Sequence, residues 1–196
     1  MQIIITMAGL GTRFRNAGYT CPKYMIEVKG KTLFEWSLES LRDYNPHVSK
    51  YIFVVLKADN SREFITSASE MLRLPAIEIC ELDHVTAGQA ETCRIAIDFC
   101  DPEESVMVYN IDTHVADMAL KYQDIDGDGY LPCFNAPGTH WSFARTDESG
   151  NVVEVREKQR ISDNCTLGAY YFSSARLYRD LYDEFYDELL MNSEQD

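Results

Sequence analysis

An apolar run followed at once by a glycine-rich loop opens the chain. Residues 2–6 read Gln-Ile-Ile-Ile-Thr, a β-branched pattern typical of a buried strand. Residues 7–14 continue as Met-Ala-Gly-Leu-Gly-Thr-Arg-Phe, and Lys23 follows directly after Pro22. Glycines let backbone N–H groups approach an anion, and an arginine adds a bidentate donor for phosphate oxygens. The segment therefore predicts a strand leading into a phosphate-binding loop, with Arg13 and Lys23 as the cations of a nucleotide triphosphate site.

Two other glycine-rich nucleotide loops fit this segment less well. A dinucleotide-binding fingerprint needs a third Gly or Ala where this chain has Phe14, and an acidic residue at the end of the second strand, where Lys57 stands. A Walker P-loop needs a Gly-Lys-Ser or Gly-Lys-Thr sequence, which the segment lacks. A plain tight turn would need neither Arg13 nor Lys23.

Strands and helices alternate through the first 110 residues. A helix is expected from Thr32, its N-cap, and two more at 61–74 and 88–99. Apolar runs predict strands at 51–56, 77–82 and 105–110, and a short apolar segment at 26–28 precedes a turn at Gly30-Lys31. This alternation predicts an α/β fold, a three-layer sandwich with a mostly parallel central sheet.

The pattern changes after Asp112. Strands are expected at 130–134, 141–146, 152–157 and 167–172, with a turn at 148–151 and a final helix at 174–190. The turn joins two of these strands into a β-hairpin insertion. Because no linker or repeat interrupts the chain, we expect a single domain over residues 1–196.

Charge and cysteine content exclude several classes of protein. The net charge of −14 argues against nucleic acid and anionic membranes as partners. The first residues include no basic n-region and Arg13 interrupts their apolar run, so we expect no signal peptide, and no stretch is long enough to span a membrane. None of the six cysteines stands in a Cys-x-x-Cys pair, which indicates reduced thiols in a cytoplasmic protein. The sequence leaves the oligomeric state open.

Further candidate site residues follow the predicted strands. Asp112 comes just after the strand 105–110, where a carboxylate faces the usual ligand crevice and can bind Mg²⁺; the alternative is an Asp that caps a turn. Asn110 is a second polar candidate. Gly88 and Gln89 open a helix where a nucleobase or sugar could pack, although a plain helix start explains them equally well.

Glu157 and Lys158 end one strand of the predicted hairpin. A charge pair there is usually a solvated strand end. If the pair faces the crevice, Lys158 could hold a phosphate and Glu157 a sugar hydroxyl.

Taken together, these motifs resemble the sugar-phosphate nucleotidyltransferases. The resemblance is carried by residues 7–14, by Pro22-Lys23 and by the Gly30 turn before a helix, and it spans residues 1–175. The later motifs occur in the family's order: Gly88, Asp112, Glu157-Lys158 and the segment 166–172. The family includes glucose-1-phosphate thymidylyl- and uridylyltransferases and phosphocholine cytidylyltransferases, and the most similar subgroup is that of short bacterial members associated with capsule or other surface glycans.

The resemblance implies a role for each candidate residue. The triphosphate would be held by Ala8, Gly9, Gly11, Thr12 and Arg13. Arg13 and Lys23 would be catalytic, Lys23 by stabilising charge on the attacked α-phosphate. Gly88 and Gln89 would contact the nucleoside, and Asp112 would bind the cofactor Mg²⁺. The acceptor would be bound by Asn110, Glu157, Lys158 and Gly168.

The implied activity joins an NTP to a small phosphorylated acceptor and releases pyrophosphate. A sugar 1-phosphate is the favoured acceptor, in precursor synthesis for a capsule or surface glycan, and phosphocholine or another phosphoalcohol is the alternative. The family usually supplies a second metal-binding Asp late in the chain, where this sequence offers Asp180, Asp183 and Asp187, all in a predicted helix. Because family members commonly continue further, we also expect the domain to be truncated at its C-terminus.

Two rival functions remain open from the sequence. A glycosyltransferase of the same general fold could use Asn110-Ile111-Asp112 as its metal motif, although such an enzyme needs no triphosphate loop. A non-catalytic nucleotide-binding protein could keep the loop without a complete metal site. Binding and cleavage of a free NTP separate the first rival from a nucleotidyltransferase, and for the second rival Lys23→Ala should leave function unchanged.

Overall fold

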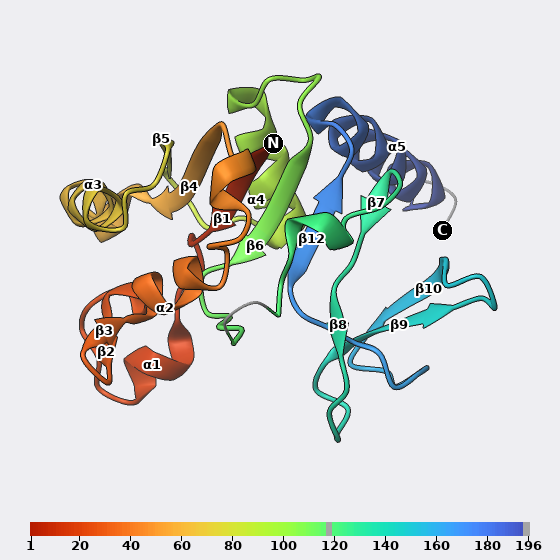
Figure 1. Cartoon of the computed structure of the whole chain (residues 1–196), viewed down its shortest axis with the longest axis horizontal. Coiled ribbons are helices and arrows are strands. Elements are labelled where there is room, and N and C mark those ends of the chain that lie inside the picture. The colour runs from red at the N-terminus through yellow and green to blue at the C-terminus, as the bar shows by residue number, and fades with distance from the viewer. Residues whose placement is uncertain (117–118, 194–196) are drawn as a thin grey trace.

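The chain folds around a six-stranded sheet in the computed structural model, which describes residues 1–116 and 119–193, without the side chains of 187–193 (Figure 1). Four parallel strands come first in the sheet, and two strands with antiparallel pairing, β12 to β6 and β7 to β12, follow. In sheet order they are β5 (Ala76–Leu82), β4 (Lys50–Leu56), β1 (Gln2–Thr6), β6 (Val106–Asn110), β12 (Ala169–Phe172) and β7 (Gly129–Tyr130). The helices are α1 (Thr12–Asn16), α2 (Leu33–Glu39), α3 (Arg62–Met71), α4 (Gln89–Ala96) and α5 (Ala175–Ser193).

Helices cover both faces of the central sheet. Successive strand residues point to opposite faces, so Ile3 and Ile5 of β1 join a cluster with α2 and α3, whereas Ile4 joins a second cluster with α4 and α5. All three isoleucines are fully buried, which explains the unbroken apolar run of β1. The predicted α/β three-layer sandwich with a mostly parallel sheet is confirmed.

The strand order reverses beside β1. The chain runs from β1 to β4 and β5 on one side, and α4 then carries it back to β6 on the other side of β1. In open α/β sheets, such a switch point leaves a crevice outside the carboxyl ends of the strands, where ligands bind. Here the crevice lies where Thr6 of β1 pairs with Asn110 of β6.

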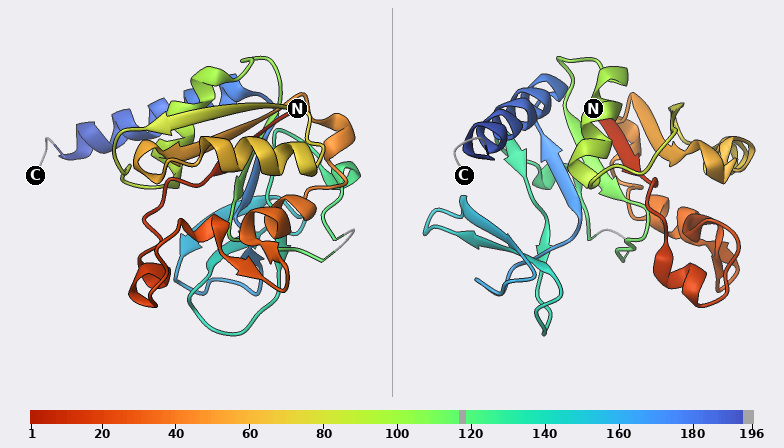
Figure 2. Two further views of the ribbon diagram at one scale, coloured as in Figure 1. Left: turned by 90° about the vertical axis from the view of Figure 1, so that its left-hand side faces the viewer. Right: turned by 180° about the vertical axis from the view of Figure 1, so that it is seen from behind.

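A second, antiparallel sheet stands beside the central one (Figure 2). Its strands, in order, are β10 (Val152–Glu157), β9 (Ser142–Thr146), β11 (Cys165–Thr166) and β8 (Cys133–Phe134). The predicted hairpin is its β9–β10 pair. This sheet and the α1 segment lie on opposite sides of the carboxyl end of β6. A short β2 (Glu27–Val28) and β3 (Lys31–Thr32) form a ribbon next to α1.

Two predicted strands are wrong in their extent. The segment 130–134 splits at Pro132 into β7 of the central sheet and β8 of the second sheet. Proline has no N–H to donate to a strand ladder, so pairing stops there. The segment 167–172 contains only β12, because Gly168 takes a left-handed φ of 83° between β11 and β12.

The predicted helices are present, with shifted ends. Thr32 caps α2 through a capping box, in which Glu35 N–H donates to the Thr32 side chain and the Glu35 carboxylate accepts from Thr32 N–H. The helix expected over 61–74 ends at Met71, because Arg73 turns into a left-handed conformation two residues before Pro75. Among the described residues, none of the helices combines the length and apolar character that crossing a bilayer requires.

Candidate active site

A pocket of about 200 Å³ opens at the carboxyl ends of β1 and β6, at the switch point of the sheet. It contains seven of the residues expected from the sequence: Ala8, Gly9, Lys23, Gly88, Gln89, Asn110 and Asp112. Four further lining residues were not predicted: Thr6, Val85, Thr86 and Thr92. Thr6 could have been found as the last residue of β1, but the others come from the turn before α4 and from α4 itself, and no sequence pattern marks them.

Lys23 and Asp112 meet in this pocket. Lys23 begins a 3₁₀ turn (Lys23–Met25), and Asp112 follows β6 by two residues. The ammonium Nζ donates to Asp112 Oδ2 at 2.8 Å, with the lysine side chain 17% and the aspartate side chain 46% exposed. The pair is open to solvent on the pocket side, so either group can exchange its partner for a ligand.

Asn110 is the centre of a small amide network behind the pocket. Gln89 Nε2 donates to Asn110 Oδ1 at 2.7 Å and to Thr6 Oγ1 at 3.2 Å. Asn110 also lies against Gly168, where a Cβ atom would come within 2.4 Å of Asn110 Nδ2. The φ of 83° and this close approach both require glycine at 168. The structure thus brings Asn110, Gln89 and Gly168 together.

The rest of the glycine-rich loop, from Leu10 onward, does not line the pocket. Gly11 has a left-handed φ of 60° and precedes α1, and a Cβ atom there would lie 3.6 Å from Lys23 Cβ. Thr12 and Arg13 begin α1 with exposed side chains that do not line the pocket. The structure therefore does not bring Gly11, Thr12 and Arg13 into the pocket, although Gly11 lies next to Lys23, which lines it.

Tyr24, the residue after Lys23, joins a cluster of polar side chains. The hydroxyl of Tyr24 donates to Asp59 Oδ2 at 3.2 Å and contacts Ser61 Oγ, while Arg15 NH2 lies 3.8 Å from Asp59 Oδ1. Burial raises the pKa of the Tyr24 hydroxyl well above its usual range. This hydroxyl therefore stays protonated and holds the lysine turn against the end of β4.

Glu157 and Lys158 lie in the second sheet, outside this pocket. Lys158 Nζ pairs with Glu157 Oε1 at 2.7 Å, and this contact lowers the pKa of the glutamate. Both side chains are 70% exposed. The structure therefore leaves them available to a ligand but does not bring them to Lys23 or Asp112.

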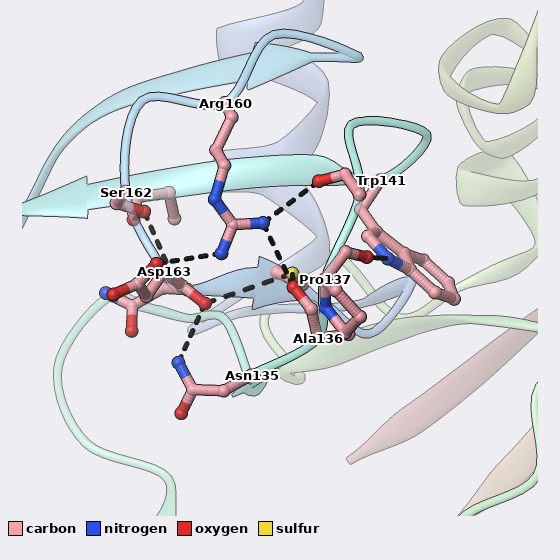
Figure 3. A network of polar contacts seen from close by, with 11 residues as sticks. Asn135, Ala136, Pro137, Trp141, Arg160, Ser162 and Asp163 are labelled. Atoms are coloured by element: carbon pink, nitrogen blue, oxygen red, sulfur yellow. Dashed lines mark hydrogen bonds and ion pairs between the residues drawn. The ribbon is translucent and has the colours of Figure 1, made fainter.

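Arg160 organises the loop beside that pair (Figure 3). Its guanidinium donates to the carbonyl oxygens of Ala136 and Gly138 at 3.0 and 2.9 Å and to Asp163 Oδ1 at 2.7 Å. The loop then leads into Trp141, whose carbonyl accepts from Lys158 N–H at 2.9 Å. Arg160 thus connects the loop 136–138 to Asp163, next to the strand end that carries Glu157 and Lys158.

The expected second metal ligand is not brought to the pocket. Asp183 of α5 accepts two hydrogen bonds from Arg94 of α4, at 2.7 and 3.2 Å. Asp180 is exposed on the same helix, and the side chain of Asp187 lies outside the described residues. Within residues 1–116 and 119–193, the described side chains form no group of three or more metal-ligating residues.

Comparisons with known proteins agree with this architecture. No protein-family model and no curated protein matches the chain. The crystal structure of the nucleoside-diphosphate-sugar pyrophosphorylase from Vibrio cholerae RC9 is 35% identical and matches 94% of this chain and 78% of that chain, with a TM-score of 0.84. The inositol-1-phosphate CTP transferase from T. maritima is 17% identical, matches 90% of this chain and 71% of that one, and has a TM-score of 0.75. The latter likeness shows a shared fold alone.

The fold is that of a nucleotidyltransferase. With a relative of 35% identity that is matched over most of its length, the chain belongs to the sugar-phosphate nucleotidyltransferase family. It is an enzyme that uses an NTP, as the N-terminal motif predicted. This membership disfavours both the glycosyltransferase and the non-catalytic alternatives.

Proposed function

We propose that this protein transfers a nucleotidyl group from an NTP to a sugar 1-phosphate and releases pyrophosphate. The observation that carries the proposal is the meeting of Lys23 and Asp112 beside the glycine-rich loop, in one pocket at the switch point of the sheet. The 35% identity to a nucleoside-diphosphate-sugar pyrophosphorylase supports the choice of a sugar phosphate. We also propose that the product serves the synthesis of a capsule or surface glycan.

The reaction is an in-line displacement at the α-phosphorus. An oxygen of the acceptor phosphate forms a new bond to the α-phosphorus, and the bond from that phosphorus to the oxygen bridging to the β-phosphate breaks. Catalysis of such a step consists mostly of positioning and neutralising charge. Lys23 stabilises the charge that develops on the α-phosphate, while Arg13 and the backbone of Ala8, Gly9, Gly11 and Thr12 hold the triphosphate.

Asp112 is the residue that would hold Mg²⁺. Its carboxylate is half exposed and already binds a cation, the Lys23 ammonium. Mg²⁺ in such enzymes is usually bound by one or two carboxylates and the substrate phosphates, which agrees with a site that lacks a larger ligand cluster among the described residues. When bound, the ion would neutralise phosphate charge.

The acceptor would lie between the pocket and the second sheet. Asn110 lines the pocket and lies against Gly168, and Glu157 and Lys158 would offer hydroxyl and phosphate contacts from the second sheet. Gln89 and Gly88 would contact the nucleoside from the start of α4.

A pyrophosphate assay tests the proposal. The protein is incubated with Mg²⁺, each of five nucleotides (ATP, CTP, GTP, UTP and dTTP) and a panel of acceptors that includes several hexose 1-phosphates and phosphocholine. We expect pyrophosphate with at least one NTP and a sugar 1-phosphate. Pyrophosphate release with phosphocholine alone would show that the acceptor is a phosphoalcohol and not a sugar 1-phosphate. No pyrophosphate release with any pair would refute the proposed activity.

A further inference from the structure

The backbone around Asp112 is held in place by α2, which lies in a distant part of the sequence. Asp112 stands in the segment that leaves β6, and it is flanked by Ile111 and Thr113. The segment has no regular secondary structure, so side chains must satisfy its backbone polar groups. Most of those side chains come from one face of α2.

Ser37 makes the central contact. Its side chain is 1% exposed, and its hydroxyl lies 2.5 Å from the carbonyl oxygen of Ile111 and 2.9 Å from that of Thr113. These two carbonyls belong to the residues on either side of Asp112. One hydroxyl proton shared between them therefore sets the direction in which the Asp112 side chain leaves the backbone.

Two further hydroxyls complete the attachment. Ser40 Oγ, three residues after Ser37, accepts from the N–H of Val115 at 2.8 Å. Tyr109 of β6 is fully buried and donates from its hydroxyl to the carbonyl of Thr113 at 3.1 Å. Burial raises the pKa of Tyr109 to about 12, so this donor keeps its proton. The segment 111–115 is thus held by hydrogen bonds at Ile111, at Thr113 and at Val115.

We propose that Ser37 is a positioning residue for the metal site, supported by Ser40 and Tyr109, and that it acts by fixing the backbone that presents Asp112. The inference rests on the proposed function, in which Asp112 binds Mg²⁺. Groups that orient a metal ligand without touching the metal commonly change metal affinity by about 10- to 100-fold when they are removed. Ser37 is more than 70 residues away from Asp112 in sequence, so only the fold reveals the connection.

The test compares NTP affinity with and without the metal. Isothermal titration of UTP, or of whichever of ATP, CTP, GTP and dTTP binds more tightly, is carried out in EDTA and in Mg²⁺. The ratio of the two dissociation constants measures the contribution of the metal, and no turnover is needed. In Ser37→Ala we expect the metal-dependent gain to fall by about tenfold or more, with NTP affinity in EDTA unchanged.

Ser69→Ala is the matched control. Ser69 is also a buried helical serine, 3% exposed, and its hydroxyl has no hydrogen-bond partner among the described residues. It lies in α3, away from the pocket. We expect wild-type behaviour from this variant, so it measures the effect of deleting any buried helix hydroxyl.

Asp112→Asn separates the possible failures. If Asp112→Asn loses the metal-dependent gain while a folded Ser37→Ala keeps it, Ser37 has a merely structural role and the inference is overturned. If Asp112→Asn keeps the gain as well, the proposed metal ligand is wrong. If Ser37→Ala does not fold, the same titrations are made with Tyr109→Phe and Ser40→Ala. A reduced metal-dependent gain in NTP affinity in either variant supports the inference, and a full gain in both refutes it.

Discussion

Lys23 Nζ lies 2.8 Å from Asp112 Oδ2, and this contact joins two residues that are 89 positions apart in the sequence. Each has a separate task in the proposed reaction, in which the lysine would stabilise charge on the α-phosphate and the aspartate would bind the metal. Without ligand they neutralise each other. Binding of a nucleotide and a metal ion must therefore break the pair and give each group a new partner of opposite charge.

Lys23→Met should lower kcat by at least about 100-fold, with a smaller change in NTP affinity. The methionine keeps an unbranched side chain only one atom shorter but removes the charge that stabilises the transition state. Steady-state pyrophosphate release and NTP titration measure the two effects. Lys57→Ala is the control, because Lys57 also pairs with an aspartate, Asp83, but is 69% exposed and outside the pocket. Equal losses in both variants would contradict the assigned role.

The same variant should bind a divalent cation more tightly when no nucleotide is present. Lys23 competes with a metal for Asp112, so its removal leaves the carboxylate without a nearby positive charge. Mn²⁺ titration followed by electron paramagnetic resonance measures this affinity. A weaker or unchanged affinity in Lys23→Met would show that the ion pair does not compete with the metal.

Gly168→Ala should both destabilise the fold and raise the KM for the NTP. The φ of 83° costs an alanine about 1–2 kcal/mol, and its Cβ would displace Asn110, which binds Gln89. Gly150→Ala is the matched control, because Gly150 has a φ of 88° but open space around its Cα. Thermal unfolding and NTP kinetics should show a loss of stability in both variants and a raised KM only in Gly168→Ala. A raised KM in both would argue against the Asn110 contact.

Arg160→Lys should raise the KM for the acceptor by about tenfold, equivalent to ~1.4 kcal/mol. The KM for the NTP should not change. A lysine cannot reproduce the planar fork that binds the loop carbonyls of Ala136 and Gly138 together with Asp163. Steady-state kinetics, in which the acceptor and the NTP are varied in turn, measure the two KM values separately. Arg156→Lys, at an exposed arginine paired with Glu154, is the control. If Arg160→Lys changes the KM for the NTP instead, the loop does not contribute to acceptor binding.

Asp183→Asn should reduce stability at neutral pH without changing the Mg²⁺ requirement. Hydrogen bonds from Arg94 lower the pKa of Asp183 below its usual 3.8. The contribution of this pair is therefore complete above that value and is lost as the pH falls through the lowered pKa. Urea unfolding at pH 7, 5 and 3 should show a difference between wild type and variant that shrinks only at the lowest pH. A changed Mg²⁺ requirement would instead favour Asp183 as a metal ligand.

Local patterns predicted most of the α/β fold. The apolar runs of β1, β4, β5 and β6 and the Thr32 cap depend on neighbouring residues, so they can be read from the sequence. The division of 130–134 at Pro132 could not, because β7 and β8 pair in different sheets and their pairing partners lie far away in the chain. Length and β-propensity look the same whether a strand stays in one sheet or crosses between two.

By itself, the sequence determined the chemistry available at the site: a glycine-rich loop after a buried strand, two cations and a carboxylate after a later strand. These features depend on residue type and on spacing along the chain. Only the tertiary structure decided which of them meet. It joined Lys23 to Asp112, placed Asn110 against Gly168, paired Asp183 with Arg94, and left Glu157 with Lys158 in the second sheet. The reason is physical, since such contacts arise from strand order and from packing between segments that the sequence separates widely.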